Sequence, residues 1–456
     1  MADPKLLAAQ QEYARRTPGS ARLWERARSW SPLGVHSNYR FLEPYPFYAQ
    51  RGEGVHLWDT DGNSYLDFNM AYGALASGHA HPKIVRALQE QLARGYVYGY
   101  EWEGTPEVAE KLCRRFGMGQ LRFSSTGLEA THHAIRFARA VTGHRYVVKF
   151  EGGYHGSHDT LLVGVKPRAD ASGPAQRPNS VPAGPGILKE VADRTRVAPY
   201  NDLESTRKIV DEHRGDVAAV ILEPIAMNMG LVLPEAGFLE GLRELCQEVG
   251  ALLIFDEIKT GGKYLHGAAG RFGVAPDIIL LGKSIACGAP LSAIAARKGL
   301  LDNVGPKRIA HAGTFNANPI SIAACRATLE HVLTEEGLER SARLSQHLAK
   351  GLAEIFHDRH VRGFLPSDGP SGAILFADQP VRNWRSFLEV DPDRSLLFQF
   401  LCLNRGLIPS GNGPDEQWTV SVAHTDGDVD QYIAVVAEMA DQLAGTPHAG
   451  EIEESV

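Results

Sequence analysis

The chain of 456 residues carries a formal net charge of −7, and 43% of its residues are hydrophobic and 22% are charged, as in ordinary globular proteins. Its length exceeds that of one ordinary domain, so we expect two domains or one large domain with an appendage. The negative charge and the lack of any basic block argue against a nucleic-acid-binding protein. No stretch of about 18 apolar residues occurs, so we expect no membrane-spanning helix.

The cysteines and the N-terminal residues suggest a reducing compartment. The five cysteines are scattered along the chain and form no Cys-x-x-Cys pair. This pattern predicts neither a disulfide framework nor a zinc site. The segment Met1–Lys5 lacks the apolar core of a signal peptide. The cytoplasm is therefore the expected location.

The first part of the chain predicts a helical arm and a hairpin. Residues 1–30 are polar and read as helical. Residues 55–58 and 64–68 have the composition of two short strands, and the Asp-Gly-Asn turn at 61–63 separates them. We expect an antiparallel pair at this position.

The middle of the chain alternates predicted strands and helices. The apolar spacing of residues 238–249 predicts a helix that ends at Gly250. Such alternation favours a parallel sheet with helices on both faces. Residues 167–187 are rich in Pro, Gly, Ala and Ser and predict a long loop, and a helical stretch followed by an α+β tail begins near residue 330. Four short apolar runs are the predicted strands: residues 146–150, 217–222, 251–255 and 278–281.

Polar residues follow three of these predicted strands. Glu223, Asp256 and Lys283 each stand at or just beyond a strand end, where open parallel sheets bind their ligands. A lysine that forms a Schiff base and an acid that keeps a pyridinium nitrogen protonated are what a pyridoxal phosphate enzyme needs. Either acid alone could equally be the polar edge of a sheet. A nucleotide-binding loop ending at Lys283 would need glycine where the chain has Asp277, and no dinucleotide-binding glycine motif follows a strand.

Two further segments suit a phosphorylated ring. Thr126 and Gly127 precede a helix predicted near residues 129–141 and offer a hydroxyl and backbone N–H groups to an anion, although an ordinary helix cap explains the local sequence better. Tyr154, beside glycines, suits stacking on a flat ring. His155 and His158 lack a third ligand for a metal, so we expect no metal site and two hydrogen-bonded histidines.

Together these residues resemble the class III aminotransferases, which have fold type I of the pyridoxal phosphate enzymes. The order and spacing match over about residues 25–440. Within the class, the chain is most similar to the glutamate-1-semialdehyde 2,1-aminomutases and their aminotransferase relatives, through residues 34–40, 178–182 and 228–230, and through Glu416 with residues 421–424. The shared motifs are Thr126-Gly127, Tyr154-His155-Gly156, Glu223-Pro224, Asp256-Glu257, Lys283 and Gly313-Thr314-Phe315.

The resemblance implies an α/β fold with a large domain and a smaller α+β domain. The large domain is expected to hold a mostly parallel seven-stranded sheet sandwiched by helices. We expect an N-terminal segment over residues 1–75 that belongs to the small domain, a cofactor-binding domain over 76–328 and a C-terminal small domain over 329–456. A homodimer with shared active sites is also implied.

The resemblance also assigns roles toward pyridoxal 5'-phosphate. Lys283 is expected to hold the cofactor and move a proton, and Asp256 is expected to pair with the pyridine nitrogen. Ile258 and Tyr154 are expected to cover the two faces of the ring, and Glu223 is expected to support its polar edge. His155 is also expected among the cofactor-binding residues. The expected phosphate ligands are Thr126, Gly127 and Leu128, with Thr314 reaching the phosphate of the neighbouring subunit.

Substrate residues follow from the same resemblance. Arg40 is expected to bind a substrate carboxylate through a two-pronged contact. Tyr72 is expected to line the entrance, and Glu416 is expected to lie on the C-terminal strand of the pocket. Tyr72 and Ala74 stand where the aminomutases usually have Trp and Pro, and Leu128 replaces a threonine of the phosphate motif.

These departures leave the cofactor residues intact and alter the substrate pocket. We therefore expect an aminotransferase that moves an amino group between a small amino acid, including β- or D-amino acids, and a keto acid. The alternative is an intramolecular aminomutase of the glutamate-1-semialdehyde type. A cofactor-binding protein without turnover is disfavoured, because Lys283, Asp256 and Arg40 occur together.

Overall fold

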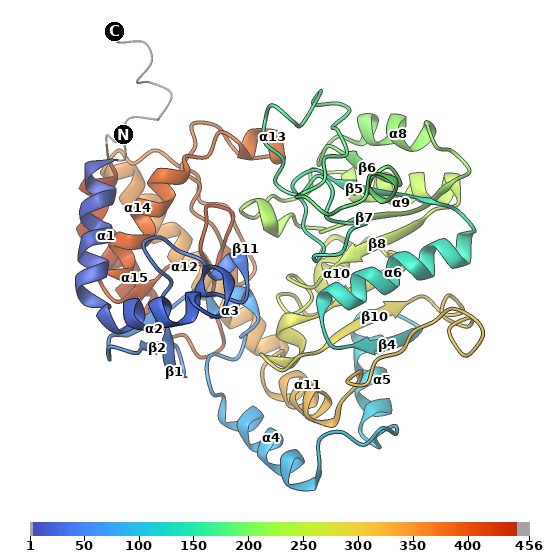
Figure 1. The fold of residues 1–456 in the computed structure, drawn as a ribbon, viewed down its shortest axis with the longest axis horizontal. Coiled ribbons are helices and arrows are strands. Elements are labelled where there is room, and N and C mark those ends of the chain that lie inside the picture. The colour runs from blue at the N-terminus through green and yellow to red at the C-terminus, as the bar shows by residue number, and fades with distance from the viewer. Residues whose placement is uncertain (1–2, 445–456) are drawn as a thin grey trace. The chain divides into compact units, whose positions relative to one another are not determined.

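The computed structural model describes residues 3–444 and divides into two compact units (Figure 1). The first unit contains the residues up to His81, Glu339–Pro380 and the residues from Glu389 on. The second contains Pro82–Leu338 and Val381–Leu388. The sequence-based limits at residues 75 and 328 lie near two of these boundaries, whereas the return of residues 381–388 to the second unit is not anticipated by them.

The second unit is built on a seven-stranded sheet in the order β4-β10-β9-β8-β7-β5-β6. Strand β10 pairs antiparallel with both neighbours, and the pairs from β9 to β6 are parallel. The predicted α/β class with a mostly parallel seven-stranded sheet is confirmed. The strands are β4 (Gln120–Ser124), β5 (Tyr146–Phe150), β6 (Thr195–Ala198), β7 (Val217–Leu222), β8 (Leu252–Asp256), β9 (Ile278–Leu281) and β10 (Ser292–Ala296).

Strand direction brings the candidate residues to one edge of this sheet. Strands β4 and β9 both run antiparallel to β10, so β4 points the same way as β5 to β9. The carboxyl ends of six strands therefore lie along a single edge, which is where open α/β sheets bind ligands. Strands β7, β8 and β9 are buried along their whole length, as their continuous apolar sequence predicts.

Helices of the second unit pack against the sheet and against one another. Helix α6 lies across β4, β10, β9, β8 and β7, and it buries Ala130, Ala134 and Phe137 in the same apolar cluster as the strands. Helix α9 ends at Gly250, whose φ of 74° is left-handed, as the predicted stop requires. The helices are α4 (Pro82–Arg94), α5 (Thr105–Arg115), α6 (Gly127–Thr142), α7 (Lys189–Ala192), α8 (Leu203–Asp211), α9 (Phe238–Val249), α10 (Gly267–Phe272), α11 (Pro319–His331) and α13 (Trp384–Phe387).

The first unit joins the two ends of the chain. The predicted hairpin forms, with His56 opposite Leu66 and Trp58 opposite Ser64, and an additional strand, β1, pairs with it. Strand β3 also pairs in parallel with β13, so residues near position 66 lie beside residues near position 407. The principal elements are α1 (Pro4–Arg16), α2 (Pro18–Arg28), β1 (Ala49–Glu53), β2 (His56–Asp59), β3 (Ser64–Asp67), α3 (Met70–Gly73), α12 (Glu335–Asp358), α14 (Pro392–Leu403), β13 (Leu407–Ile408), β14 (Trp418–Thr419) and α15 (Asp426–Leu443), with β11 (Ser367–Asp368) and β12 (Ser371–Gly372) beside β14.

Two further observations concern membrane-spanning helices and disulfides. Among residues 3–444, no helix has both the length and the apolar character needed to cross a membrane. The five cysteines, all within this range, form no disulfide.

Candidate active site

Three neighbouring strands place Glu223, Asp256 and Lys283 along the carboxyl edge of the larger unit's sheet. Glu223 directly follows β7, Asp256 is the last residue of β8, and Lys283 comes two residues after β9. In the register of the β8–β9 pair, Asp256 lies opposite Leu280. Glu223 and Asp256 are buried, and Lys283 is half-buried. The sequence-based grouping of these three residues therefore has a geometric basis.

Two hydrogen bonds hold the carboxylate of Asp256. Its Oδ2 accepts a hydrogen bond from Nδ1 of His155 at 2.7 Å, and its Oδ1 accepts one from the N–H of Ile258 at 3.1 Å. The side chain of His155 is fully buried, and Thr131 donates its hydroxyl to the His155 carbonyl at 2.7 Å. The carboxylate is thereby fixed in orientation.

The two histidines of this segment differ from the expectation that both are hydrogen-bonded. Nε2 of His155 and both ring nitrogens of His158 are buried without a hydrogen-bond partner among residues 3–444. Burial, reinforced by nearby His132, lowers the pKa of His158 to about 3, so its ring is neutral. The prediction is wrong for His158 and holds for one nitrogen of His155.

Lys283 occupies a strained backbone position. Its φ of 49° is in the left-handed region, which side chains other than glycine rarely adopt, and it follows the fully extended Gly282. A Cβ atom on Gly282 would come within 3.3 Å of Ile258, and one on Gly127 would come within 2.7 Å of Ile258. Ile258 is thus packed between the lysine turn and the start of α6. Strain of this kind concentrates at functional sites.

The turn after β5 contacts Glu223 as well as Asp256. The N–H of Tyr154 donates to Oε1 of Glu223 at 3.2 Å, and the N–H of Met227 donates to its Oε2 at 3.1 Å. Burial raises the pKa of Glu223 above the usual carboxyl range. The ring of Tyr154 is half-buried, and burial also raises the pKa of its hydroxyl.

The start of α6 combines a helix cap with groups that suit an anion. Thr126 Oγ1 accepts the N–H of Glu129 at 3.2 Å, and Glu129 Oε2 accepts the N–H groups of Ser125 and Thr126, each at 2.8 Å. This capping box is the ordinary cap that the local sequence favours. The N–H groups of Gly127 and Leu128 have no acceptor in the described part of the chain, so two first-turn donors are available to a phosphate.

The predicted substrate residues gather in the first unit. Burial raises the pKa of Tyr72 to about 12, and the Glu416 carboxylate adds to the rise while Arg40 opposes it, so all three lie near one another. Tyr72 donates its hydroxyl to the Tyr39 carbonyl at 2.5 Å. Arg40 is exposed and Glu416 is buried.

The backbone that carries Tyr72 is strained over several residues. Met70, Ala71 and Tyr72 have φ values of 46°, 53° and 58°, and the N–H of Tyr72 is held by Asn69 Oδ1 at 2.7 Å. Three consecutive left-handed residues other than glycine cost free energy, and structure of this kind is typical of functional sites.

Thr314 is a cofactor-binding candidate that is exposed to solvent. It belongs to an exposed loop between β10 and α11, next to Phe315, which is 59% exposed. No hydrogen bond of Thr314 joins it to the other candidates among the described residues.

Three charged residues at this edge were not anticipated. Lys149 lies inside the apolar strand β5, is fully buried and donates to the carbonyls of Gly153 and Val163, both at 2.7 Å. Glu151 is buried and pairs with Arg385 at 2.7 Å. A lysine within a predicted buried strand is a signal that could have singled out Lys149. Nothing in the local sequence marks Arg385.

The fold and the edge residues define a pyridoxal phosphate enzyme of fold type I. The residues fit this cofactor, because a buried, oriented carboxylate, a lysine on a strained turn and two unused helix N–H groups meet at one edge. The class III aminotransferase family model matches residues 40–399, which shows that the chain belongs to this family. Its cofactor is pyridoxal 5'-phosphate.

Individual relatives cover nearly the whole chain. A glutamate-1-semialdehyde 2,1-aminomutase from Desulfitobacterium hafniense is 41% identical over 422 residues, which is 90% of this chain and 95% of that protein. An omega-transaminase structure from Sphaerobacter thermophilus has a TM-score of 0.88 at 33% identity and covers 95% of this chain and 100% of that one. A β-phenylalanine aminotransferase structure from Variovorax paradoxus has a TM-score of 0.87 at 30% identity, covering 98% and 99%.

Lys283 is predicted to be the residue that binds the cofactor covalently. Borohydride reduction of the purified protein followed by peptide mapping should place the pyridoxyl group on Lys283, because this lysine adjoins Asp256 along the strand-end edge. Lys149, Lys259 and Lys263 are the internal controls. A label on any of these three contradicts the assignment.

Proposed function

We propose that pyridoxal phosphate binds at the carboxyl edge of the larger unit's sheet and is attached to Lys283. When bound, the cofactor stabilises the negative charge that develops on the carbon next to an amino group. Asp256 keeps a proton on the ring nitrogen, which favours this stabilisation. The amine of Lys283, freed when the substrate amino group takes its place on the cofactor, would take the proton from that carbon and later deliver one, first as general base and then as general acid. The observation that carries the proposal is the meeting of Glu223, Asp256 and Lys283 on adjacent strand ends.

The remaining edge residues are proposed to orient the ring. Ile258 and Tyr154 cover its two faces, and His155 fixes the Asp256 carboxylate through the 2.7 Å contact. Glu223 supports the polar side of the ring. Thr126 and the N–H groups of Gly127 and Leu128 hold the phosphate, with the positive end of α6 directed at it.

We infer that the amino group moves within one substrate, as in a 2,1-aminomutase. The aminomutase relative at 41% identity over 90% of the chain supports this alternative better than the transfer reaction that we expect from the sequence. Transfer between an amino acid and a keto acid is the second candidate. It is supported by the transaminase structures at 33% and 30% identity and by Tyr72 and Ala74, which depart from the aminomutase pattern.

The need for an amino acceptor separates the two reactions. With glutamate-1-semialdehyde as the only substrate, the aminomutase proposal predicts continued conversion to the isomeric 5-amino-4-oxo acid over many turnovers without added keto acid. A parallel panel supplies amino donors, β- and D-amino acids included, with pyruvate or 2-oxoglutarate. Turnover only in the second panel would establish the transferase and contradict the mutase.

Arg40 is proposed to bind the substrate carboxylate. Its planar guanidinium can form two parallel hydrogen bonds to a carboxylate, which the point charge of lysine cannot reproduce. Arg40→Lys should therefore reduce kcat/KM for carboxylate substrates by about 1.5–3 kcal/mol of transition-state stabilisation. Amines without a carboxylate, assayed in parallel, should lose much less. Equal losses for both substrate types would mean that Arg40 acts through folding.

We propose that the protein is a homodimer in which Thr314 reaches the cofactor phosphate of the partner subunit. The exposed position of Thr314 supports this, as do apolar side chains on the surface of the larger unit, namely Leu92, Tyr96, Val97, Tyr98, Tyr100 and Phe315. Sedimentation velocity of the holoenzyme should give a dimer. The variant Thr314→Ala should lose the cofactor faster but should remain a dimer. An active monomer would contradict the proposal.

A cytoplasmic location is the compartment that we propose. Five cysteines without a disulfide suit a reducing environment. Recovery of the protein in the cytosolic fraction of its cell would support this location, and recovery in a secreted fraction would contradict it.

A further inference from the structure

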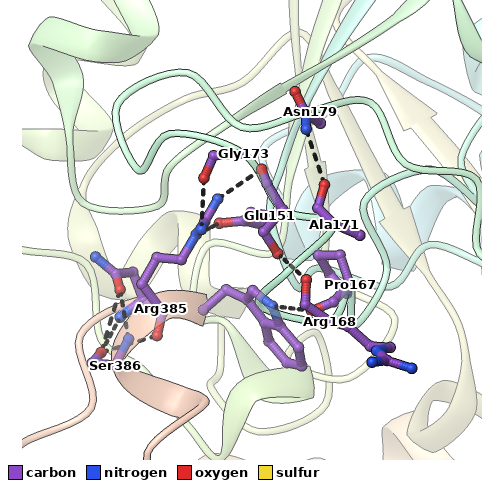
Figure 2. Close-up of polar contacts among 11 residues, drawn as sticks. Glu151, Pro167, Arg168, Ala171, Gly173, Asn179, Arg385 and Ser386 are labelled. Atoms are coloured by element: carbon purple, nitrogen blue, oxygen red, sulfur yellow. Dashed lines mark hydrogen bonds and ion pairs between the residues drawn. The ribbon is translucent and has the colours of Figure 1, made fainter.

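Residues Val381–Leu388 form a short excursion of the chain into the larger unit, although the residues on both sides of it belong to the first unit. Its single turn of helix, α13, is capped by Asn383 and Ser386, which bond to each other's side chains and backbone (Figure 2). Trp384 is buried and donates its Nε1–H to the Pro167 carbonyl at 2.9 Å. The excursion is therefore firmly anchored.

Arg385 on this excursion holds two separate segments. Its Nε donates to Oε2 of Glu151 at 2.7 Å, and its two terminal nitrogens donate to the carbonyls of Gly173 and Ser172 at 3.0 and 2.9 Å. Figure 2 shows the guanidinium reaching between Glu151 and the loop that contains Gly173. The Glu151 side chain is 1% exposed and that of Arg385 is 23% exposed, so the ion pair is largely shielded from water.

Glu151 begins the turn that carries Tyr154 and His155, and several residues hold this turn through hydrogen bonds. Lys149 binds the Gly153 carbonyl, and Glu223 accepts the N–H of Tyr154. Asp256 binds the ring of His155. A Cβ atom on Gly152 would come within 2.7 Å of both Met229 and Trp384, so the backbone also fits closely against the excursion. Arg385 supplies the cation that pairs with the first residue of this turn, Glu151.

We propose that Arg385 is a positioning residue that locks the turn of Tyr154 and His155 together with the loop over residues 167–173. This inference rests on the proposed placement of Tyr154 and His155 at the cofactor. The guanidinium neutralises the buried Glu151 carboxylate, and its remaining donors bind loop carbonyls that otherwise lack a bond to this turn. Loss of Arg385 therefore removes one contact from the cofactor-facing turn and two from the loop at the same time.

Removal of Arg385 should change the protein in three measurable ways. In Arg385→Met the Glu151 carboxylate stays buried without its cation, which is much less stable than the intact pair. Trypsin should then cleave the loop after Arg168, which is followed by Ala169, about tenfold faster, and the holoenzyme should release pyridoxal phosphate about tenfold faster, the scale of one lost charge-assisted bond. The circular dichroism of the cofactor band should fall, because it reports how firmly the ring is held.

Three further variants separate positioning from general damage. Arg382→Ala is the matched control, because Arg382 lies on the same excursion, its side chain is 69% exposed and it only reaches Glu235 at 3.4 Å. It should leave all three measurements unchanged. Arg385→Lys keeps the charge and should recover part of the dichroism. In the double variant Arg385→Met, Glu151→Gln the buried charge is gone, so cofactor release should be no faster than in Arg385→Met alone.

The outcomes distinguish this inference from the proposed function. A borohydride label on Lys283 in the wild type, with cofactor release and dichroism in Arg385→Met equal to those of Arg382→Ala, overturns the positioning role and leaves the proposed site intact. A label on another lysine overturns both. If Arg385→Met does not fold, the variants Glu151→Gln and Arg385→Lys test the positioning role in its place. Dichroism equal to that of the wild type in both variants overturns the inference.

Discussion

The direction of the strands in the larger unit is the constraint on which the candidate site depends. Strand β10 runs against its two neighbours, and this single reversal returns β4 to the direction of β5 to β9. The start of α6, the turn of Tyr154, and the residues Glu223, Asp256 and Lys283 consequently meet along one edge. If β10 were parallel to its neighbours, the short connection from β9 to β10 would have to become a longer crossover connection.

Buried charge is the second feature that determines the structure of the candidate site. Lys149, Glu151, Glu223 and Asp256 are all withdrawn from water, which is costly unless each is paired or hydrogen-bonded. The chain offsets this cost by giving each charge a specific acceptor, donor or counter-ion. Burial lowers the pKa of Lys149 to about 7, with the Glu223 and Glu151 carboxylates opposing the decrease. These charges therefore form one connected group, and a change in one of them alters the electrostatic setting of the others.

The sequence predicts the framework of the site better than its supporting contacts. Strands β5, β7 and β9 have the predicted bounds, because a continuous apolar run between turn residues is a local signal. The ends of those strands then identify Glu223, Asp256 and Lys283. By contrast, the unpartnered ring of His158 and the pairing of Arg385 with Glu151 depend on contacts between distant segments. Residue spacing carries no information about such contacts. The added strand β1 was also not predictable from the sequence, because its residues, Ala-Gln-Arg-Gly-Glu, are mostly polar and show no strand pattern.

The excursion at Val381–Leu388 also has a consequence for the order in which the protein is made. All strands of the seven-stranded sheet have been synthesised once the ribosome passes residue 296, but Arg385 is added about 90 residues later, at synthesis rates of about 5–20 residues per second. For those several seconds every strand of the sheet has been made while the loop at Ser172 and Gly173 lacks the group that holds it. Likewise, β3 can pair with its parallel neighbour β13 only after residues 407–408 have been synthesised. The nascent chain therefore contains all seven strands before it contains Arg385, and the contacts of Arg385 with Glu151, Ser172 and Gly173 form only once the last part of the chain is being made.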